Sequence, residues 1–545
     1  MKKLLKRLCS AMVAAVMVMT MAPAAFAADG GAQFQNGPYL LAPKTNSMVV
    51  VWESTEKVSA TIAYGTDESK LCDPIKVEID ADAPDFKGSK MNLFHYKLDN
   101  LTPGTRYYYE VKLEGGATCK ASFKTLSEKP DQIRLITLSD SHIFATRAEL
   151  DQAIKEFDPD LLLHCGDMVE GTGAQAEQFS FWFQGKVEND YIHSYPVVYS
   201  SGNHDQGGVY FNTYVYSIQD EEYGAEVEGD SSFNYAGLHI ITMNSNPWGL
   251  FQMNSEATGQ KADAATIKTI DNAMNWLKKD LATDAAKNAD FRLIFMHHPV
   301  SDAYTKRYIP AVIEPGKVDL LLSGHTHSYA RAVSSNPAVG AGTIYLTHQD
   351  ARTYNKKGDF FYITSTPGSG VLDVKNYGAT AAGQESKVAN ETLVAKDKQQ
   401  LSWSDISITP STVLYNGEVT VTAKVTNNGK GLAAAVIPVV DNGTTRYLYK
   451  FEDGIVTLDP GKSATLTGTL RMEKLGTHTL KLADKTVSVN VKYRPATFDY
   501  TNIRTQQGNG KTSDMNSNIL HIKADVVNIG NDAGTGTAEF KVNGV

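Results

Sequence analysis

Residues 134–142 read RLITLSDSH, and residues 161–167 read LLLHCGD. In both stretches a short apolar run, typical of a buried β-strand, leads into a motif that contains aspartate. Three more apolar runs, at residues 196–199, 293–296 and 320–322, lead into motifs of the same kind. The five motifs are Asp140-Ser141-His142, Gly166-Asp167, Gly202-Asn203-His204-Asp205, His297-His298-Pro299 and Gly324-His325-Thr326-His327. Because ligands bind at strand ends in α/β sheets, the pattern predicts an α/β domain whose site lies where the motifs meet.

The residue types in these motifs indicate a site for two metal ions. Imidazole binds Zn, Fe and Mn, whereas carboxylate and amide oxygens suit harder divalent ions. Since one carboxylate can bridge two ions, we expect Asp167 to be the bridge. Two ions about 3.5–4 Å apart would polarise a phosphoryl group and lower the pKa of a shared water. We expect His204 to protonate the leaving group and Asp205 to hold the tautomer of the His204 imidazole.

Together the motifs resemble those of the calcineurin-like metallophosphoesterases, whose order D-x-H, G-D, G-N-H-[DE], H-x-P, G-H-x-H is complete here. The resemblance covers residues 134–331 and implies a four-layer αββα domain that hydrolyses phosphoric esters with a metal-activated hydroxide. It implies that His204 is the general acid, and that His297 rather than His298 is the ligand of the H-x-P motif. The implied ligands are Asp140, His142, Asp167 and His327 for one ion, and Asp167, Asn203, His297 and His325 for the other.

Other polar residues of this region are expected to be structural. His164 lies within an apolar run and is interpreted as a packed histidine. Ser141 has no triad partners in sequence order, so we do not expect it to be a nucleophile. Lys306 and Arg307 are interpreted as a solvated pair of loop charges. Three histidines lack ligand spacing and are also expected to be structural: His193, His239 and His348.

Residues 32–127 contain short β-type runs separated by Gly and Pro turns, which predicts a β-sandwich. The runs VVVW at 49–52 and LTPGTRYYY at 101–109 resemble the fibronectin-type-III-like domain that precedes the catalytic domain in purple acid phosphatases. The chain has His142 and Glu170 where those enzymes have Gly and Tyr, so their purple tyrosinate–iron centre is not expected. We expect a colourless site that holds two divalent ions of Mn, Zn or Fe.

The N-terminus predicts export. Four basic residues precede an apolar stretch at residues 11–21 and an Ala25-Phe26-Ala27 site, a pattern typical of a bacterial signal peptide cleaved near Ala27. Its removal takes the net charge from −9 to −13, which argues against a nucleic-acid-binding surface. No apolar run is long enough for a transmembrane helix. The sequence leaves open whether Cys72 and Cys119 form a disulfide after export.

The rest of the catalytic region alternates between helix-type and strand-type patterns. Apolar spacing predicts helices at residues 147–157 and 264–281, the second with a buried face of apolar residues. An antiparallel strand pair is expected between them, at residues 232–235 and 238–242. Polar, aromatic-rich stretches at residues 206–231 and 243–263 are expected to be loops over the site. The residues expected on the buried face of the second helix are Ile267, Ile270, Met274, Leu277 and Leu281.

The C-terminal part contains an internal repeat. Asn427 and Asn528, Gly429 and Gly530, and Asn442-Gly443 and Asn543-Gly544 are each offset by 101 residues. The repeated segments look like bacterial immunoglobulin-like sandwich modules, of which the second is incomplete. The predicted organisation is a signal peptide (1–27), an N-terminal domain (32–127), a catalytic domain (130–375), a linker or terminal excursion of that domain (376–404), a first module (405–492) and a second (493–545).

Two functions follow from these patterns. The first is a secreted phosphatase or phosphodiesterase that acts on phosphate esters outside the cell or at its surface. The alternative is a surface or cell-wall-associated binding protein, in which the C-terminal β-modules do the main work by attaching to wall or glycan.

Overall fold

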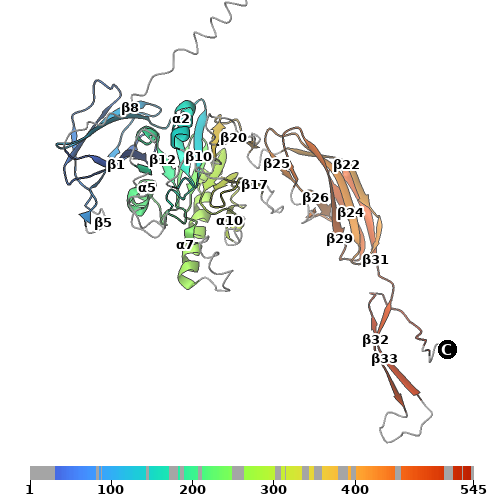
Figure 1. The fold of residues 1–545 in the computed structure, drawn as a ribbon. Coiled ribbons are helices and arrows are strands. Elements are labelled where there is room, and N and C mark those ends of the chain that lie inside the picture. Colours follow the sequence, from blue (N-terminus) through green and yellow to red (C-terminus); the bar gives the residue numbers. More distant parts are fainter. Residues whose placement is uncertain are drawn as a thin grey trace, which may run out of the picture. The chain divides into compact units, whose positions relative to one another are not determined.

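The computed structural model (Figure 1) describes the chain in segments, and the described residues form two compact units. One unit contains residues 1–399 with 430–432, and the other contains residues 400–429 with 433–545. The predicted signal peptide, Lys306 and Arg307 lie outside the described residues. The described residues are 31–81, 85–86, 89–142, 147–170, 179, 182–183, 190–205, 211–247, 263–300, 308–313, 315–333, 343–348, 359–378, 391–394, 400–448, 456–507, 520–530, 532–539 and 541.

The N-terminal domain is a β-sandwich, as predicted. Its two main sheets have the strand orders β1-β2-β7 and β4-β3-β8-β9, and β5 and β6 form a small separate pair. Trp52 and Phe94 stack in its core with ring centroids 5.3 Å apart. Cys72 is exposed and Cys119 is buried, and both are free thiols, so the disulfide that the sequence left open is not formed. The strands are β1 (Phe34–Leu41), β2 (Met48–Ser54), β3 (Ala60–Gly65), β4 (Ile75–Val77), β5 (Asp85–Phe86), β6 (Ser89–Lys90), β7 (Leu93–Leu98), β8 (Arg106–Leu113) and β9 (Thr118–Lys124).

Two six-stranded sheets form the centre of the catalytic domain, with the orders β12-β11-β10-β19-β20-β21 and β13-β14-β15-β16-β18-β17. All five strands predicted to precede a motif are present, and β13 and β14 form the predicted antiparallel pair. The strand β21 lies in the stretch expected to be a linker or excursion and pairs with β20. The strands are β10 (Ile133–Leu138), β11 (Leu161–His164), β12 (Val197–Tyr199), β13 (Ser231–Tyr235), β14 (Leu238–Thr242), β15 (Phe291–Phe295), β16 (Leu320–Ser323), β17 (Ala330–Val333), β18 (Ile344–Thr347), β19 (Asp359–Ser365), β20 (Val371–Gly378) and β21 (Glu391–Val394).

Alternation of side chains along the strands builds the four layers. Leu135 and Leu293 belong to one core between the two sheets. The next residues along the strands, Ile136 and Ile294, point outward into two other cores, one containing α2 (Arg147–Phe157) and the other α7 (Ala264–Leu281). A strand buried on both faces needs apolar residues throughout, which explains the continuous apolar runs in the sequence. The predicted αββα arrangement is therefore confirmed.

The helices match the prediction in part. The two predicted helices have the expected bounds, and the side chain of Asp263 caps α7 by accepting the backbone N–H of Thr266 at 2.7 Å. Ile267, expected on the buried face of α7, is 41% exposed. The expectation of a loop over residues 206–231 is wrong, because η2 (Asn212–Tyr216), a π-helix, and α5 (Ser217–Tyr223) lie there. The remaining helices among the described residues are η1 (Asp190–His193), α8 (Asp284–Asn288) and α10 (Pro310–Ile313).

The N-terminal sandwich packs directly against the catalytic domain. In β1 and β2, alternate residues such as Tyr39 and Val51 leave the sandwich core and join the core that contains α2. The hydroxyl of Tyr39 donates to the carbonyl of Tyr214 in η2 at 2.8 Å, and the Tyr214 hydroxyl donates to the buried carboxylate of Glu53 at 3.0 Å. The hydroxyl of Tyr109 donates to the carbonyl of His193 at 2.8 Å. These buried contacts make the two domains one compact unit.

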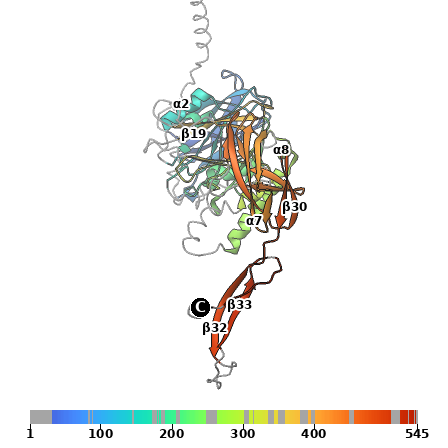
Figure 2. The same cartoon turned by 90° about the vertical axis from the view of Figure 1, so that its right-hand side faces the viewer.

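The C-terminal unit is all-β. Its first module has sheets ordered β22-β24-β29 and β23-β31-β30-β26-β27 around a common core, and a separate pair, β25-β28. The hairpin of β32 and β33, seen in Figure 2, repeats the β22–β24 pairing with a register shift at the corresponding place, between Thr501 and Arg504 as between Ser404 and Ser407. The strands are β22 (Leu401–Thr409), β23 (Thr412–Leu414), β24 (Glu418–Asn427), β25 (Ala433–Ala435), β26 (Ile437–Asp441), β27 (Thr444–Leu448), β28 (Val456–Leu458), β29 (Ser463–Arg471), β30 (Gly476–Leu482), β31 (Lys485–Lys492), β32 (Phe498–Gln507) and β33 (Leu520–Asn528).

A membrane-crossing helix was not expected from the sequence. Within the described ranges, every helix is too short or too polar to span a bilayer.

Candidate metal centre

The five motifs follow the carboxyl ends of β10, β11, β12, β15 and β16, and their side chains converge at one place. Several of these residues have left-handed backbone conformations that are unfavourable for residues other than glycine. Such strain persists only where the surrounding structure imposes it, and it is typical of functional sites. The residues and their φ angles are Asp140 (52°), His142 (46°), Asp167 (56°), His325 (71°) and His327 (50°).

The glycines of the motifs allow the chain to pass close to the carboxylates. A Cβ on Gly202 would lie 2.1 Å from Oδ1 of Asp167, and a Cβ on Gly324 would lie 2.2 Å from Oδ2 of Asp140. Neither separation is sterically possible, so both positions require glycine. The motif glycines therefore serve the packing around the two acidic residues.

The first cluster is the set expected for one ion. One ligand atom from each of its four residues lies within 4.8 Å of the others: Asp140, His142, Asp167 and His327. Nε2 of His327 is 3.1 Å from Oδ1 of Asp140. Burial opposes ionisation of Asp140, but the imidazoles of His327 and His297 outweigh it and hold the pKa of Asp140 below its usual range. The cluster thus carries an ionised carboxylate in a buried position, which a cation would neutralise.

The hydrogen bonding and the protonation state of His142 suit a metal ligand. Its Nδ1 lies 3.1 Å from the carbonyl of Val169, and since a carbonyl only accepts, Nδ1 carries the hydrogen. Its Nε2 is buried and has no hydrogen-bond partner among the described residues. Burial also lowers the pKa of His142, which favours the neutral ring that a metal ligand requires. An unpartnered, buried lone pair directed into a carboxylate cluster fits a metal ligand.

The second cluster centres on His297. Its Nδ1 donates to the carbonyl of Cys165 at 3.0 Å, and its Nε2 lies 3.1 Å from Oδ2 of Asp167 and 3.1 Å from Oδ1 of Asn203. Burial alone would lower the pKa of His297, but the carboxylates of Asp167 and Asp140 raise it to about 9. The oxygens around Nε2 therefore stabilise a positive charge at this point. A divalent ion shared by His297, Asp167 and Asn203 would supply that charge.

His325 and His298 complete this cluster, each with one ligand atom within 4.8 Å of the others and of His297. Burial lowers the pKa of His325 to about 4, so its ring is neutral. The family resemblance implied that His297 rather than His298 is the ligand. In the structure the ligand atoms of both histidines lie in this group. Nδ1 of His298 lies 2.9 Å from the hydroxyl of Ser245. Ser245 follows β14 outside every motif, so spacing could not have indicated it.

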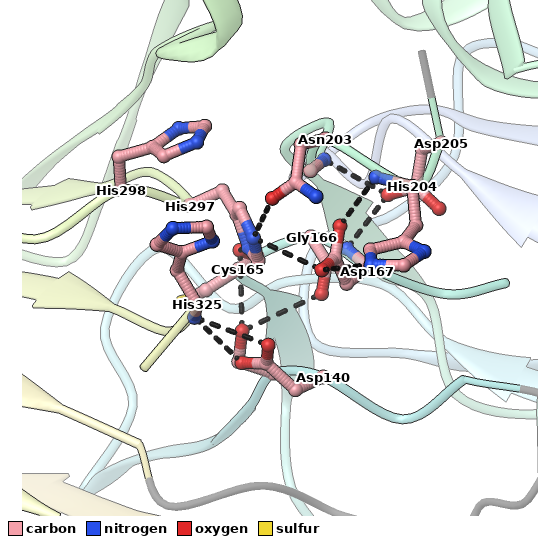
Figure 3. A network of polar contacts seen from close by, with 12 residues as sticks. Asp140, Cys165, Gly166, Asp167, Asn203, His204, Asp205, His297, His298 and His325 are labelled. Carbon is pink, nitrogen blue, oxygen red and sulfur yellow. Dashed lines mark hydrogen bonds and ion pairs between the residues drawn. The ribbon is translucent and has the colours of Figure 1, made fainter. Parts of the chain in front are cut away.

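Asp167 lies between the two clusters. Figure 3 shows its carboxylate between the imidazoles of His297 and His204. Its Oδ2 is 3.1 Å from Nε2 of His297, and its Oδ1 accepts the backbone N–H of His204 at 2.8 Å. Asp167 also belongs to the group of Asp140 and His142. This position is the one expected of a bridging ligand.

The expected pairing of Asp205 with the imidazole of His204 is wrong. The Asp205 carboxylate accepts four backbone N–H groups instead, from Asp167 at 2.7 Å, Met168 at 2.8 Å, Gly202 at 2.9 Å and Val169 at 3.3 Å. Burial and the nearby Asp167 carboxylate raise the pKa of Asp205 to about 7. Asp205 therefore ties two motif loops together.

The carbonyl of Glu170 orients His204 in place of Asp205. Nδ1 of His204 donates to this carbonyl at 2.6 Å, which leaves Nε2 on the side of Asp167, 3.9 Å from its Oδ2. The side chain of His204 is 33% exposed, so a substrate can reach it. Because any residue can supply a backbone carbonyl, the residue types of a motif do not predict such a partner.

The histidines expected to be structural are buried and lie outside both clusters. His164 is within hydrogen-bonding distance of the Ser141 hydroxyl at 2.9 Å, and burial lowers its pKa to about 3. His193 hydrogen-bonds the carbonyl of Pro38. His239 pairs with Asp280 at 2.8 Å. His348 contacts the hydroxyl of Thr137 at 3.1 Å.

Comparison with known proteins identifies two domains of this chain. Residues 133–329 match the calcineurin-like phosphoesterase family, and residues 38–125 match the purple acid phosphatase N-terminal domain. Among solved structures, PhoD is similar, with 12% identity, a TM-score of 0.50, and coverage of 68% of this chain and 92% of that chain. A dimetal phosphatase from Danio rerio has 12% identity and a TM-score of 0.36, covering 48% of this chain and 99% of its own. No curated protein sequence matches this chain.

Proposed function

Because this chain has a calcineurin-like metallophosphoesterase domain behind a purple acid phosphatase N-terminal domain, we propose that it is an exported hydrolase of phosphoric esters that works with two metal ions. The observation that carries the proposal is the position of Asp167. Its carboxylate belongs to the cluster of Asp140, His142 and His327 and also contacts His297 of the second cluster. Export is inferred from the signal-peptide pattern at residues 1–27.

The donor atoms fit two divalent ions. The first set offers two carboxylates and two imidazoles: Asp140, Asp167, His142 and His327. The second offers the Asp167 carboxylate, the Asn203 amide oxygen and the imidazoles of His297 and His325. Mixed oxygen and imidazole donors suit Mn, Zn and Fe. The ions would neutralise charge on the phosphoryl group and supply a nucleophilic water at neutral pH.

His204 is the proposed general acid. Because its Nδ1 hydrogen is held by the Glu170 carbonyl, the ring presents Nε2 toward the site. A proton on Nε2 would pass to the oxygen of the departing alcohol as the ester bond breaks. Asp205 contributes indirectly, since its four backbone contacts fix the loops that carry Asp167 and His204.

Hydrolysis by the full chain tests the proposal. A chelator first removes bound metal from the chain. After Mn²⁺ or Zn²⁺ is added back, the chain should hydrolyse p-nitrophenyl phosphate or its bis-ester. Activity that is absent with every divalent ion would contradict the function. Activity that survives complete removal of metal would contradict the two-ion mechanism.

A second candidate function is attachment to a cell wall or glycan. The observation that favours it is that residues 400–429 and 433–545 form a compact all-β unit with a core of its own. In such a protein the β-modules would bind an insoluble polysaccharide while the phosphoesterase acts nearby. Sedimentation of the full chain with whole cells or insoluble polysaccharide tests this. A chain that stays in the supernatant in every case would contradict it.

A further inference from the structure

The two positions at which the metal site departs from the purple acid phosphatase pattern are in contact. Oε2 of Glu170 lies 3.0 Å from Nδ1 of His142. That oxygen is buried and has no hydrogen-bond partner among the described residues, although the Glu170 side chain as a whole is 42% exposed. A buried carboxylate oxygen without a hydrogen-bond donor is costly unless a positive charge lies close by. The cluster of Asp140, His142, Asp167 and His327 is the place where such a charge would reside.

The geometry around His142 makes this contact specific. The Nδ1 hydrogen is directed at the Val169 carbonyl at 3.1 Å, and the Glu170 carboxylate lies beside the same hydrogen. The Val169 carbonyl and the Glu170 carboxylate both lie on the segment that follows Asp167. Asp205 holds this segment by accepting the N–H groups of Met168 and Val169. The two groups beside Nδ1 of His142 are therefore on a fixed stretch of chain.

A carboxylate beside the outer nitrogen of a metal-bound imidazole has a known physical effect. It fixes the ring orientation and makes the inner nitrogen a stronger donor to the metal. Here the inner nitrogen is the unpartnered Nε2 of His142. A cation held by that nitrogen would also attract the Glu170 carboxylate and offset the cost of burying its Oε2.

We propose that Glu170 is a positioning residue for the first ion, whose carboxylate orients His142 and raises the affinity of its cluster for a divalent cation. This inference rests on the proposed two-ion function. It assigns a role to the residue that stands where the purple enzymes have tyrosine. The Glu170 carbonyl holds His204 independently, and substitution of the side chain leaves that carbonyl in place.

Calorimetric titration of the chelator-stripped full chain with Mn²⁺ or Zn²⁺ tests the proposal without any substrate. Wild-type protein should bind two ions. Glu170→Gln removes the charge and keeps the shape. It should weaken the binding of one of the two ions by about 10–100-fold and leave the affinity for the other unchanged. Glu170→Asp should recover part of the affinity. Glu226→Gln is the matched control, because Glu226 is exposed and pairs only weakly with Lys279 at 3.7 Å; it should bind like wild type.

His142→Ala identifies which ion is affected. It should weaken the same ion, and adding Glu170→Gln to it should cause little further loss. Unchanged affinity in Glu170→Gln, or equal weakening of both ions with a lower melting temperature, would overturn the positioning role while the proposed function stands. A wild-type chain that binds no divalent ion would overturn the proposed function and this inference together.

Discussion

Nε2 of His164 lies 2.9 Å from the hydroxyl of Ser141, and Nδ1 of the same ring accepts the backbone N–H of Gly166 at 3.1 Å. Because Nδ1 accepts, Nε2 carries the hydrogen and Ser141 is the acceptor. This buried histidine therefore joins the loop that carries Asp140 and His142 to the loop that carries Asp167. Ser141, which lies between two proposed ligands, therefore has a structural role as the acceptor of this hydrogen bond.

Ser141→Ala tests that role. The substitution leaves the Nε2 hydrogen of His164 buried without an acceptor, which should cost about 1–3 kcal/mol of unfolding free energy. Turnover of p-nitrophenyl phosphate should fall by less than about tenfold, equivalent to about 1.4 kcal/mol in the barrier. Denaturant unfolding and steady-state kinetics measure the two effects. A folded variant with no activity would show that Ser141 takes part in the chemistry.

His204→Ala should keep both ions and lose about 10²–10⁴ in turnover, the usual contribution of a positioned proton donor. The loss should be larger for alkyl phosphates than for nitrophenyl phosphates, since nitrophenolate leaves without protonation. Asp205→Ala is the contrast, because it removes an acceptor of four backbone N–H groups. It should lower the melting temperature and slow both ester types alike. Equal losses for both ester types in His204→Ala would contradict the acid role.

Glu53 should make stability depend on pH. Burial raises its pKa, although hydrogen bonds from Tyr214 and Asn36 oppose the shift. A raised carboxyl pKa means that the folded state resists ionisation. The stability contribution of Glu53 is therefore complete below the pKa of the unfolded chain and is lost as pH rises through the folded pKa.

Thermal melts of wild type and Glu53→Gln between pH 4 and pH 8 check this prediction. Gln can accept the same two hydrogen bonds but cannot ionise. The melting temperature of the variant relative to wild type should rise with pH and then level off. A difference that is constant across the range would show that Glu53 does not titrate in this window.

The protein as isolated should be colourless. The residues that surround the two clusters supply Asp, Asn and His donors, and Glu170 occupies the position where a purple enzyme has its tyrosine ligand. Without a tyrosinate on iron there is no source for the visible charge-transfer band. A visible absorption spectrum, recorded with the metal content of the same sample, checks this. A strong band from a purple protein would require a tyrosine ligand and a different site.

Sequence patterns predicted the strands, and the convergence of the motif side chains, for a physical reason. Strands such as β10 and β15 are buried on both faces, so their apolar runs are continuous, and the motif residues follow directly after them. The helices over residues 212–223 do not stand out in the apolar pattern, because tyrosine supplies much of their buried face. Phe211, Tyr214, Val215 and Ile218 have helical spacing and are all buried, but the polar residues between them gave the appearance of a loop.

Contacts made through the backbone could not be predicted. The partner of His204 is the carbonyl of Glu170, and the partners of Asp205 are backbone N–H groups. Any residue can supply such groups, so sequence adjacency suggested the pairing of Asp205 with His204 instead. Ser245, which contacts His298, lies more than fifty residues away in sequence and comes close only through the β14–β15 pairing.

In the proposed hydrolytic site one carboxylate, that of Asp167, serves two ions. Metal content per chain after gel filtration, measured together with p-nitrophenyl phosphate hydrolysis for wild type and Asp167→Asn, tests it most directly. We expect two ions and activity in wild type, and loss of ion binding at both clusters together with loss of activity in the folded variant. A variant that keeps two ions per chain, or a wild type that hydrolyses the ester with a single ion, would contradict it.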